Sequence, residues 1–467
     1  MEDRQVNTGL IGLVVAVATI GGFMFGYDSG VINGTQKGLE AAFDLGRLGI
    51  GVNVGAILVG SSIGAFGAGR LSDLIGRRNT MMLSAVLFLV SALAAGAATS
   101  STIFIIARII GGLGVGAASV TAPVYISEVT PANVRGRLSS IQQVMIIAGL
   151  TGAFVANFAL ARLAGGSTAT FWGGYEAWRW MFWLQVIPAA IYLFALLLIP
   201  ESPRYLMVRG REAQAQAVLT RLFGAETAAR KVADIRASLA ADHHKPKLSD
   251  LLDRTTGRVR PILWVGIGLA VFQQLVGINV VFYYGATLWE AVGFTEDYAL
   301  QTNILSGVLS IGACLLTIAL IDRIGRRPLL LVGSAGMAVS LATVAWAFAQ
   351  AVPDGAGGVT LPGNAGIVAL VAANVYVVFF NASWGPVMWV MLGEMFPNQI
   401  RGSALAVAGF AQWIANALIS VSFPSLVVSP GLSITYLGYA AAAAVSFFFV
   451  RAAVTETRGR ELEDMKG

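Results

Sequence analysis

Twelve apolar stretches of about twenty residues divide this chain, and they constrain its fold more than any other feature. They fall at roughly 10–32, 49–69, 79–98, 103–124, 138–161, 178–199, 259–285, 299–320, 328–350, 366–392, 403–425 and 433–454. About twenty helical residues cross the ~30 Å hydrocarbon layer of a bilayer. Charged residues make up only 12% of the chain, about half the share in soluble proteins. We therefore predict an all-α membrane protein with 12 transmembrane helices.

Charge and layout predict how the blocks are arranged. Most of the 31 Lys and Arg residues lie at the termini or in loops after even-numbered blocks, and cytoplasmic loops carry such an excess. Both termini are therefore predicted to be cytoplasmic. The first block is kept as a helix because it is too long for a signal-peptide core and no cleavage site follows it. We expect an N-terminal six-helix bundle at 1–200, a cytoplasmic helical linker at 201–258, and a C-terminal six-helix bundle with a short tail at 259–467.

The same charge segregation explains the net charge of +6, so no basic patch remains for nucleic acid. The linker reads as a layer of short amphipathic helices, with a regulatory partner site as the alternative.

Cys314 is the single cysteine, and both histidines, His243 and His244, lie in the linker. A disulfide framework, a thiolate metal site and a membrane-embedded histidine relay are thereby excluded. We expect no metal, no cofactor and no enzyme activity.

Two motifs occur once in each half of the chain. Residues 128–136 and 394–402 both read E-x-x-P-x-x-x-R-G, and residues 73–78 and 322–327 both read D-x-I-G-R-R. An internal duplication in a membrane protein is typical of transporters built from two similar halves around a midplane site. The repeat therefore predicts two pseudo-symmetric bundles.

The charged residues of these motifs are candidates for a cytoplasmic gate. Carboxylates and guanidiniums at helix ends can pair in bidentate geometry across neighbouring helices. The alternative is that the basic residues only orient the chain. We expect the two R-G arginines and the two motif glutamates to form a network that closes only in outward-facing states. The candidates are Asp73, Arg77, Arg78, Glu128, Arg135, Glu201, Arg204, Asp322, Arg326, Glu394 and Arg401.

Neutral amides and aromatic residues recur inside the apolar blocks. An amide both donates to and accepts from a sugar hydroxyl without a charge to desolvate, and an aromatic ring covers the C–H face of a sugar. The alternative is interhelical hydrogen bonding. Gln273 and Asn279 lie slightly off one helical face unless the helix bends or breaks near Gly277, as helices at transporter sites often do. The candidates are Gln143, Gln273, Gln274, Asn279, Asn381, Trp384, Trp389, Gln412, Trp413 and Asn416.

Several segments together resemble the sugar porter family of the major facilitator superfamily, and most of all its bacterial proton-coupled xylose and hexose symporters. The resemblance covers the whole chain in order. It rests on Phe25-Gly-Tyr-Asp28, the 69–78 motif, Pro123-Val-Tyr-Ile-Ser-Glu128, Pro200-Glu-Ser-Pro-Arg204, Gln273-Gln-Leu-Val-Gly-Ile-Asn279 and the two R-G turns. It implies the major facilitator fold and monosaccharide transport.

The resemblance also implies site residues. Its sugar ligands match Gln143, Gln273, Gln274, Asn279, Trp389 and Gln412, with Tyr283 and Trp413 as aromatic neighbours. The chain departs from the family at Ser310, where an Asn is usual, and at Leu150, where xylose symporters can place an amide. Both changes leave the sugar open. The tail also departs, because Thr455 stands where the family has Pro, and we expect a local change there.

Asp28 and Arg108 are the charges inside the blocks that need partners, and they lie at similar depth. A buried acid beside a guanidinium can alternate between ion-paired carboxylate and neutral acid, so the pair is a candidate proton-coupling device. A static ion pair is the alternative. In the resembled family, proton symporters keep this acid, whereas uniporters generally lack it.

These features predict a monomeric transporter of the bacterial inner membrane that imports a pentose or hexose, such as D-xylose or D-glucose, together with protons. A proton-independent facilitated-diffusion uniporter is the alternative. A non-transporting sugar sensor is disfavoured because sensors of this family usually have long cytoplasmic extensions.

Overall fold

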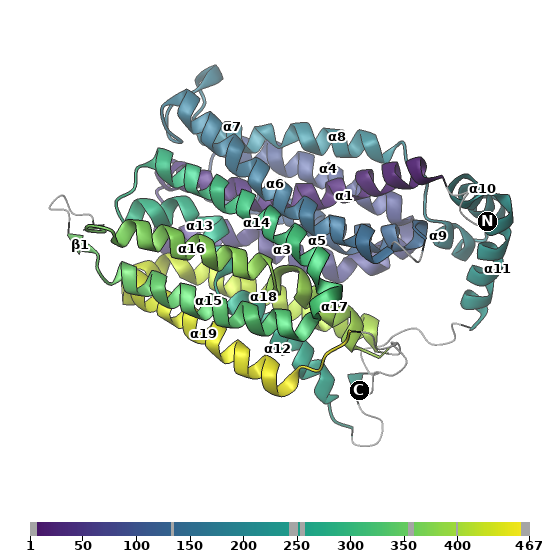
Figure 1. Cartoon of the computed structure of the whole chain (residues 1–467). Helices are drawn as coiled ribbons and strands as arrows, with labels where there is room; N and C mark the ends of the chain where they lie inside the picture. Colours follow the sequence, from purple (N-terminus) through teal and green to yellow (C-terminus); the bar gives the residue numbers. More distant parts are fainter. Residues whose placement is uncertain are drawn as a thin grey trace.

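The chain forms two halves of long, nearly parallel and antiparallel helices that lie against each other (Figure 1). The computed structural model describes residues 7–131, 135–241, 251–252, 257–353, 359–397 and 400–458. It contains 11 segments long and apolar enough to span a membrane. The last, Arg401–Ala453, has 53 residues and consists of two helices separated by a break at Ser429. The structure therefore agrees with the twelve crossings predicted from the apolar blocks.

The N-terminal half contains helices α1 to α8. Their bounds are α1 Thr8–Val31, α2 Gln36–Phe43, α3 Arg47–Ile75, α4 Arg77–Ala97, α5 Ser101–Val129, α6 Arg135–Ala164, α7 Ala177–Leu184 and α8 Val186–Leu196, with short turns η1 Ile32–Gly34 and η2 Trp172–Gly174. Helix α1 packs between α5 and α6 and also contacts α8.

Three short helices follow this half and lie beside the N-terminus (Figure 1). They are α9 Pro203–Val208, α10 Glu212–Phe223 and α11 Ala225–Ala241. The backbone N–H of Asn7 donates to the carbonyl of Leu222 at 2.9 Å, which ties the start of α1 to this layer. On this arrangement we propose the division into two bundles and a linker that the sequence predicts.

The C-terminal half contains α12 to α19. The bounds are α12 Pro261–Leu275, α13 Ile278–Ala291, α14 Glu296–Ile324, α15 Arg326–Phe348, α16 Ala365–Asn381, α17 Trp384–Met395, α18 Arg401–Leu426, η4 Val427–Gly431 and α19 Leu432–Ala453, and a short hairpin pairs β1 Val352–Pro353 with β2 Val359–Thr360. Across the halves, α3 packs against α18 and α6 against α14. The end of the molecule that carries η1 and this hairpin is called the outer end below, after the orientation that the sequence predicts.

Glycine permits the closest helix crossing in the N-terminal half. A Cβ atom placed on Gly26 of α1 would lie 1.7 Å from the carbonyl oxygen of Ile146 on α6, and one on Gly149 would lie 1.9 Å from the carbonyl oxygen of Phe23. Small residues allow backbones to approach in this way where lipid offers no hydrophobic driving force for helix association. The α1–α6 crossing therefore fixes the position of the helix that carries Asp28.

We expect Gly26→Ala to destabilise the N-terminal half by about 1–3 kcal/mol, because an overpacked contact must open. Thermal unfolding in detergent measures the loss. Gly67→Ala is the control, since a Cβ at Gly67 of α3 meets nothing within 4 Å. Equal stability of the two variants would contradict the close crossing.

Candidate functional site

A chain of hydrogen-bonded amides lies where the seventh crossing is broken. Helix α12 ends at Leu275 and α13 begins at Ile278. Between them Gly277 adopts the left-handed conformation with φ 80°, which glycine reaches without steric cost. The break rotates Asn279 onto the face of Gln274, whose Oε1 accepts from Asn279 Nδ2. The structure thus contains the helix break on which the shared face of Gln273 and Asn279 depends.

The row of hydrogen-bonded amides continues into a second helix of the same half. Gln274 Nε2 donates to Gln273 Oε1 at 3.1 Å, and Gln412 Nε2 of α18 donates to the same oxygen at 2.9 Å. Gln273 Nε2 donates to the carbonyl of Trp384 at 3.0 Å, next to the break between α16 and α17. Three amides around the α12–α13 break and one from α18 therefore meet. We call Gln273, Gln274, Asn279 and Gln412 the amide cluster.

The cluster suits a neutral, hydroxyl-rich ligand. Gln273 and Gln274 are 3% and 5% exposed, and Asn279 and Gln412 are half-buried. Each amide offers both donors and an acceptor, so a sugar hydroxyl can replace an amide–amide bond without leaving a buried group unpaired. A charged ligand would find no counter-ion among the four side chains.

The other predicted sugar ligands are less closely tied to this cluster. Trp413 is 7% exposed and its ring lies 5.8 Å from Phe25 of α1, so this contact crosses the two halves. Tyr283 is 5% exposed, Trp389 is 40% exposed, and Gln143 is half-buried on α6. Their sugar contacts stay predictions.

Asn381 is bonded elsewhere in the C-terminal half. Its Nδ2 donates to Ser310 Oγ at 3.1 Å and to the carbonyl of Val377 at 3.0 Å, and it is 2% exposed. Ser310 is the position where the resembled family usually has Asn. In this chain the Asn381 amide pairs with that position, so its role as a sugar ligand stays a prediction.

Asp28 and Arg108 form a fully buried ion pair. Arg108 Nη1 lies 2.6 Å from Asp28 Oδ1, and both side chains have 0% exposure. Arg108 Nη2 also donates to the backbone carbonyl of Asp28 at 2.8 Å, and the guanidinium lies 5.4 Å from the centre of the Phe182 ring. The structure thus brings together the two charges that the sequence left without partners.

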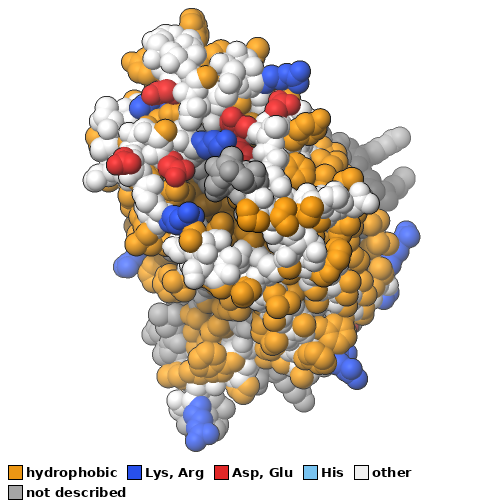
Figure 2. Space-filling model, turned by 90° about the vertical axis from the view of Figure 1, so that its left-hand side faces the viewer, with side chains coloured by type: hydrophobic (Ala, Val, Ile, Leu, Met, Phe, Trp, Pro, Cys, Tyr) orange, Lys and Arg blue, Asp and Glu red, His pale blue; other side chains and the backbone are white. Residues whose placement is uncertain are grey.

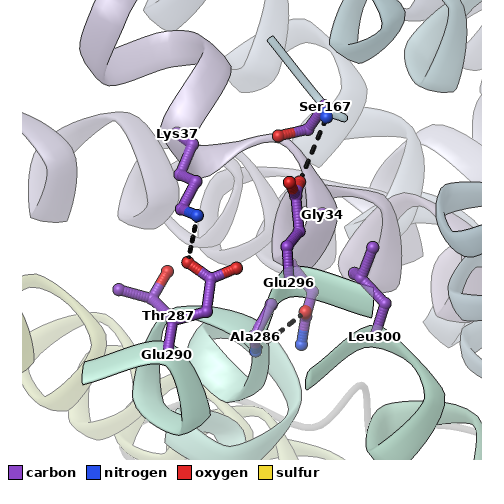
Figure 3. Close-up of a pocket in the computed structure, with 9 residues that line it drawn as sticks. Gly34, Lys37, Ser167, Ala286, Thr287, Glu290, Glu296 and Leu300 are labelled. Carbon is purple, nitrogen blue, oxygen red and sulfur yellow. Dashed lines mark hydrogen bonds and ion pairs between the residues drawn. The ribbon is translucent and has the colours of Figure 1, made fainter. Parts of the chain in front are cut away.

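A polar seam joins the two halves at the outer end (Figure 3). Asn33 Nδ2 donates to the carbonyl of Phe282 at 2.7 Å, and Asn33 Oδ1 accepts from the backbone N–H of Ala286 and from Asn303 Nδ2. Thr287 Oγ1 donates to Gln36 Oε1 at 2.8 Å. These contacts connect η1 and α2 with α13 and α14, so they hold the outer ends together.

Two carboxylates complete this seam. Lys37 Nζ lies 2.5 Å from Glu290 Oε2, and the backbone N–H of Ser167 donates to Glu296 Oε1 at 3.1 Å. Figure 2, a view of the outer end, shows acidic and basic side chains gathered on one part of the face and hydrophobic side chains over much of the rest. Our sequence reasoning missed this contact. The available signal was a pair of opposite charges at the outer ends of corresponding blocks, the first and the seventh.

We expect Glu290→Gln to open the outer end more often, because Lys37 loses its charged partner. Leu300 lines the same pocket, so a Leu300→Cys probe in a Cys314→Ala background reports access of an impermeant maleimide. Labelling should accelerate about two- to fivefold, the range expected for a weak ion pair. Glu176→Gln is the control, because its pair with Arg179 lies within one half. Unchanged labelling would show that the seam does not depend on this ion pair.

At the opposite end, the gate candidates of the N-terminal half pair with one another. Arg77 Nε and Nη2 donate to the two oxygens of Glu128 at 3.1 and 3.2 Å, and Arg77 Nη1 pairs with Asp73 at 2.9 Å. Glu201 Oε1 accepts from the backbone N–H groups of Arg77 and Arg78 at the start of α4. Arg204 lies on α9 next to this cluster, and Arg78 Nε donates to the carbonyl of Leu196.

The C-terminal half repeats this arrangement. Arg326 donates to both oxygens of Glu394 at 2.9 and 2.8 Å and pairs with Asp322 at 3.0 Å. Glu456 accepts from the backbone N–H groups of Arg326 and Arg327. Burial alone would raise the pKa of Glu456, but hydrogen bonds from Arg458 and three further backbone N–H groups outweigh it and hold the pKa below its ordinary value.

Glu456 and Thr457 are counterparts of Glu201 and Ser202 that our sequence reasoning missed. Thr457 Oγ1 donates to Glu394 at 2.6 Å, as Ser202 Oγ donates to Glu128. A third repeat, Glu-Ser against Glu-Thr after the last crossing of each half, was the available signal. The departure at Thr455 is local, because Glu456 still caps α15.

The predicted gate across the halves is not formed by these contacts, since Glu128 and Glu394 each pair with an arginine of their own half. Arg401 donates to the carbonyl of Phe396, and the side chain of Arg135 lies outside the described residues. The cross-half network was expected only in outward-facing states, and it stays a prediction.

Comparison with known proteins identifies the family. The profile described as "Sugar (and other) transporter" matches residues 14–467. The chain is 48% identical over 465 residues to the "Glucose transport protein" of Synechocystis sp., covering 99% of this chain and 98% of that protein. It is 36% identical over 496 residues to the "D-xylose-proton symporter" of Escherichia coli K12, covering 99% and 96%.

The chain belongs to the sugar transporter family of the major facilitator superfamily. The inward open structure of the E. coli xylose transporter XylE superposes on it with a TM-score of 0.82 at 34% identity, covering 97% of this chain and 99% of the other. The resemblance drawn from the motifs is thereby confirmed. The protein is a multi-pass membrane transporter of sugars and not an enzyme.

Proposed function

We propose that this transporter imports an aldopentose or aldohexose by proton symport, with alternating access to the amide cluster. The buried Asp28–Arg108 pair carries the proposal. Removing ionisable groups from water inside a membrane costs free energy, so such groups usually mark a functional site. The names of its relatives, a glucose transport protein and a D-xylose–proton symporter, support this class of sugar and of coupling.

The amide cluster and its aromatic neighbours form the proposed sugar site. Gln273, Gln274, Asn279 and Gln412 would bind hydroxyls, and Trp413 lies where the two halves meet. Because the outer seam is closed, we assign this structure to an inward-facing state of the cycle. The high similarity to an inward open xylose transporter supports this assignment.

Coupling follows from the charge on Asp28. Ionised Asp28 holds Arg108 in the ion pair, which ties α1 to α5. A proton taken up by Asp28 removes the charge–charge attraction, so with sugar bound α1 moves readily relative to α5 only in the protonated carrier, and the carrier returns empty after releasing both sugar and proton. The proton and the sugar then cross together. We place the protein in the bacterial inner membrane with both termini in the cytoplasm, working as a monomer.

Uptake into proteoliposomes tests this function. A panel of labelled D-glucose, D-xylose and other pentoses and hexoses would be offered with and without an inward pH gradient. We expect at least one of the first two sugars to accumulate above its outside concentration only when the gradient is present. Equilibration of the sugar without accumulation would instead support the proton-independent uniporter.

A further inference from the structure

The Asp28 carboxylate is fully buried in this structure, with 0% of its side chain exposed. One oxygen, Oδ1, is held by Arg108, whereas Oδ2 has no hydrogen-bond partner among the described residues. A Cβ placed on Gly111 of α5 would lie 3.1 Å from this Oδ2 and 2.4 Å from Ser91 Oγ of α4. Asp28 Oδ2 and Ser91 Oγ therefore border the same glycine. The Ser91 hydroxyl is likewise unpaired among the described residues.

The polar line continues toward the cytoplasmic end. A Cβ on Gly21 of α1 would lie 2.6 Å from the Tyr192 hydroxyl of α8 and 3.5 Å from Ala118 of α5. Gly21 precedes Asp28 by seven residues and Ala118 follows Gly111 by seven. Seven helical residues return to the same face about 10 Å along the axis, so Tyr192 lies about 10 Å from Asp28 toward the cytoplasm.

Helix spacing places Gln185 near the Asp28–Arg108 ion pair, on the same face as Tyr192. It precedes Tyr192 by seven residues and has helical dihedral angles, φ −61° and ψ −22°, so it lies about 10 Å back toward the outer end on the same face. It also follows Phe182, whose ring contacts Arg108, by about one turn. Gln185 is 0% exposed, and both of its amide atoms lack partners among the described residues.

On the cytoplasmic side of Tyr192, the line of polar residues reaches the charged cluster that contains Glu128 and Arg77. Thr121 lies one turn beyond Ala118 on α5, is 1% exposed, and its hydroxyl is unpaired in the described part of the chain. Tyr125 follows by about one turn and donates to the carbonyl of Pro200 at 2.6 Å. Glu128, seven residues after Thr121, is the carboxylate that binds Arg77. Buried polar groups are normally hydrogen-bonded, and water can bond to several polar groups at once, so the unpaired groups along this line favour water as their further partner.

We propose that Ser91, Gln185, Tyr192 and Thr121 form a hydrated proton route inside the N-terminal bundle, leading from Asp28 to Glu128 without passing through the sugar site. Asp28 gives its proton to water beside Ser91 and becomes the carboxylate that Arg108 binds. The proton moves along the polar line, and sugar and proton leave by separate paths. This inference rests on the proposed proton coupling through Asp28.

The double variant Gln185→Leu with Tyr192→Phe tests the route in the full-length protein in proteoliposomes. Sugar-induced proton uptake and accumulation driven by a pH gradient should both slow at least tenfold. Sugar counterflow, which needs no net proton transfer, should stay within about twofold of the parent and shows that the variant is folded. Ser91→Ala and Thr121→Val should each slow proton uptake in the same direction.

Two variants serve as matched controls. Ser84→Ala removes a fully buried hydroxyl from the same helix as Ser91, but that hydroxyl is bonded to the carbonyl of Thr80. Tyr436→Phe removes a buried tyrosine hydroxyl that is also unpaired among the described residues, but in the other half. Both should keep parental proton uptake.

Parental proton uptake in the double variant would overturn the route, and so would an equal loss of counterflow, because the residues would then serve the moving helices. If the parent itself moves no protons with sugar, the symport proposal fails first. That result is distinct from a failed route in a coupled parent.

Discussion

Replacing Asp28 by Asn should abolish sugar accumulation driven by a pH gradient while leaving sugar counterflow. The Asn side chain has the shape of the protonated acid and can still accept a hydrogen bond from Arg108, but it cannot give up a proton. The variant is therefore expected to behave as the permanently neutral carrier, which exchanges sugar without an energy source. The measurement is uptake into proteoliposomes with an imposed gradient, compared with exchange of labelled for unlabelled sugar across the same vesicles.

Asp297→Asn is the control for this change. Asp297 lies at the outer start of α14, where it accepts from Gln301 Nε2 at 2.7 Å, far along the chain from the ion pair. It should accumulate sugar like the parent. An Asp28→Asn protein that still concentrates sugar would reduce the Asp28–Arg108 pair to a structural ion pair and leave the coupling acid unassigned.

Replacing Gln273 by Leu should weaken sugar binding by at least about tenfold to a hundredfold. Gln273 is the shared member of the amide cluster, because its Oε1 accepts from both Gln274 and Gln412 and its Nε2 donates to the Trp384 carbonyl. Its loss leaves a sugar hydroxyl without a partner in the bound state, and an unpaired buried polar group costs about 1–3 kcal/mol. Binding of the transported sugar to the purified protein, measured by calorimetry, gives the change in Kd.

Asn374→Leu is the matched control for a buried amide of the same half. Asn374 bonds to Ser306 at 2.8 Å and to the carbonyl of Leu370 and lies outside the amide cluster, so it should lower stability without changing Kd. Tight binding by the Gln273→Leu protein would show that the cluster only connects helices.

Several features were readable from the sequence because they depend on short stretches of chain. A helix that crosses a bilayer needs only about twenty apolar residues in a row. The left-handed Gly277 and the repeated arginine motifs are likewise local, so the helix break at Gly277 and the charged clusters of both halves could be anticipated. Asp28 and Arg108 stood out because a charge within an apolar block has few ways to be satisfied.

Other features depend on how far each helix is rotated and how deep it sits, and the tertiary structure alone decided them. In a soluble protein the apolar stripe of a helix reports its rotation, but lipid is as apolar as the protein interior, so membrane helices lack a clear stripe. The sequence therefore could not show that Asn381 pairs with Ser310, and for Lys37 and Glu290 it offered only opposite charges at the ends of corresponding blocks. It also could not show that Ser91 of α4 borders Gly111 of α5 beside Asp28. The local sequence could identify candidate residues for these sites. Which of them touch was decided by helix crossings, such as that of Gly26 and Ile146, which bring distant segments into contact.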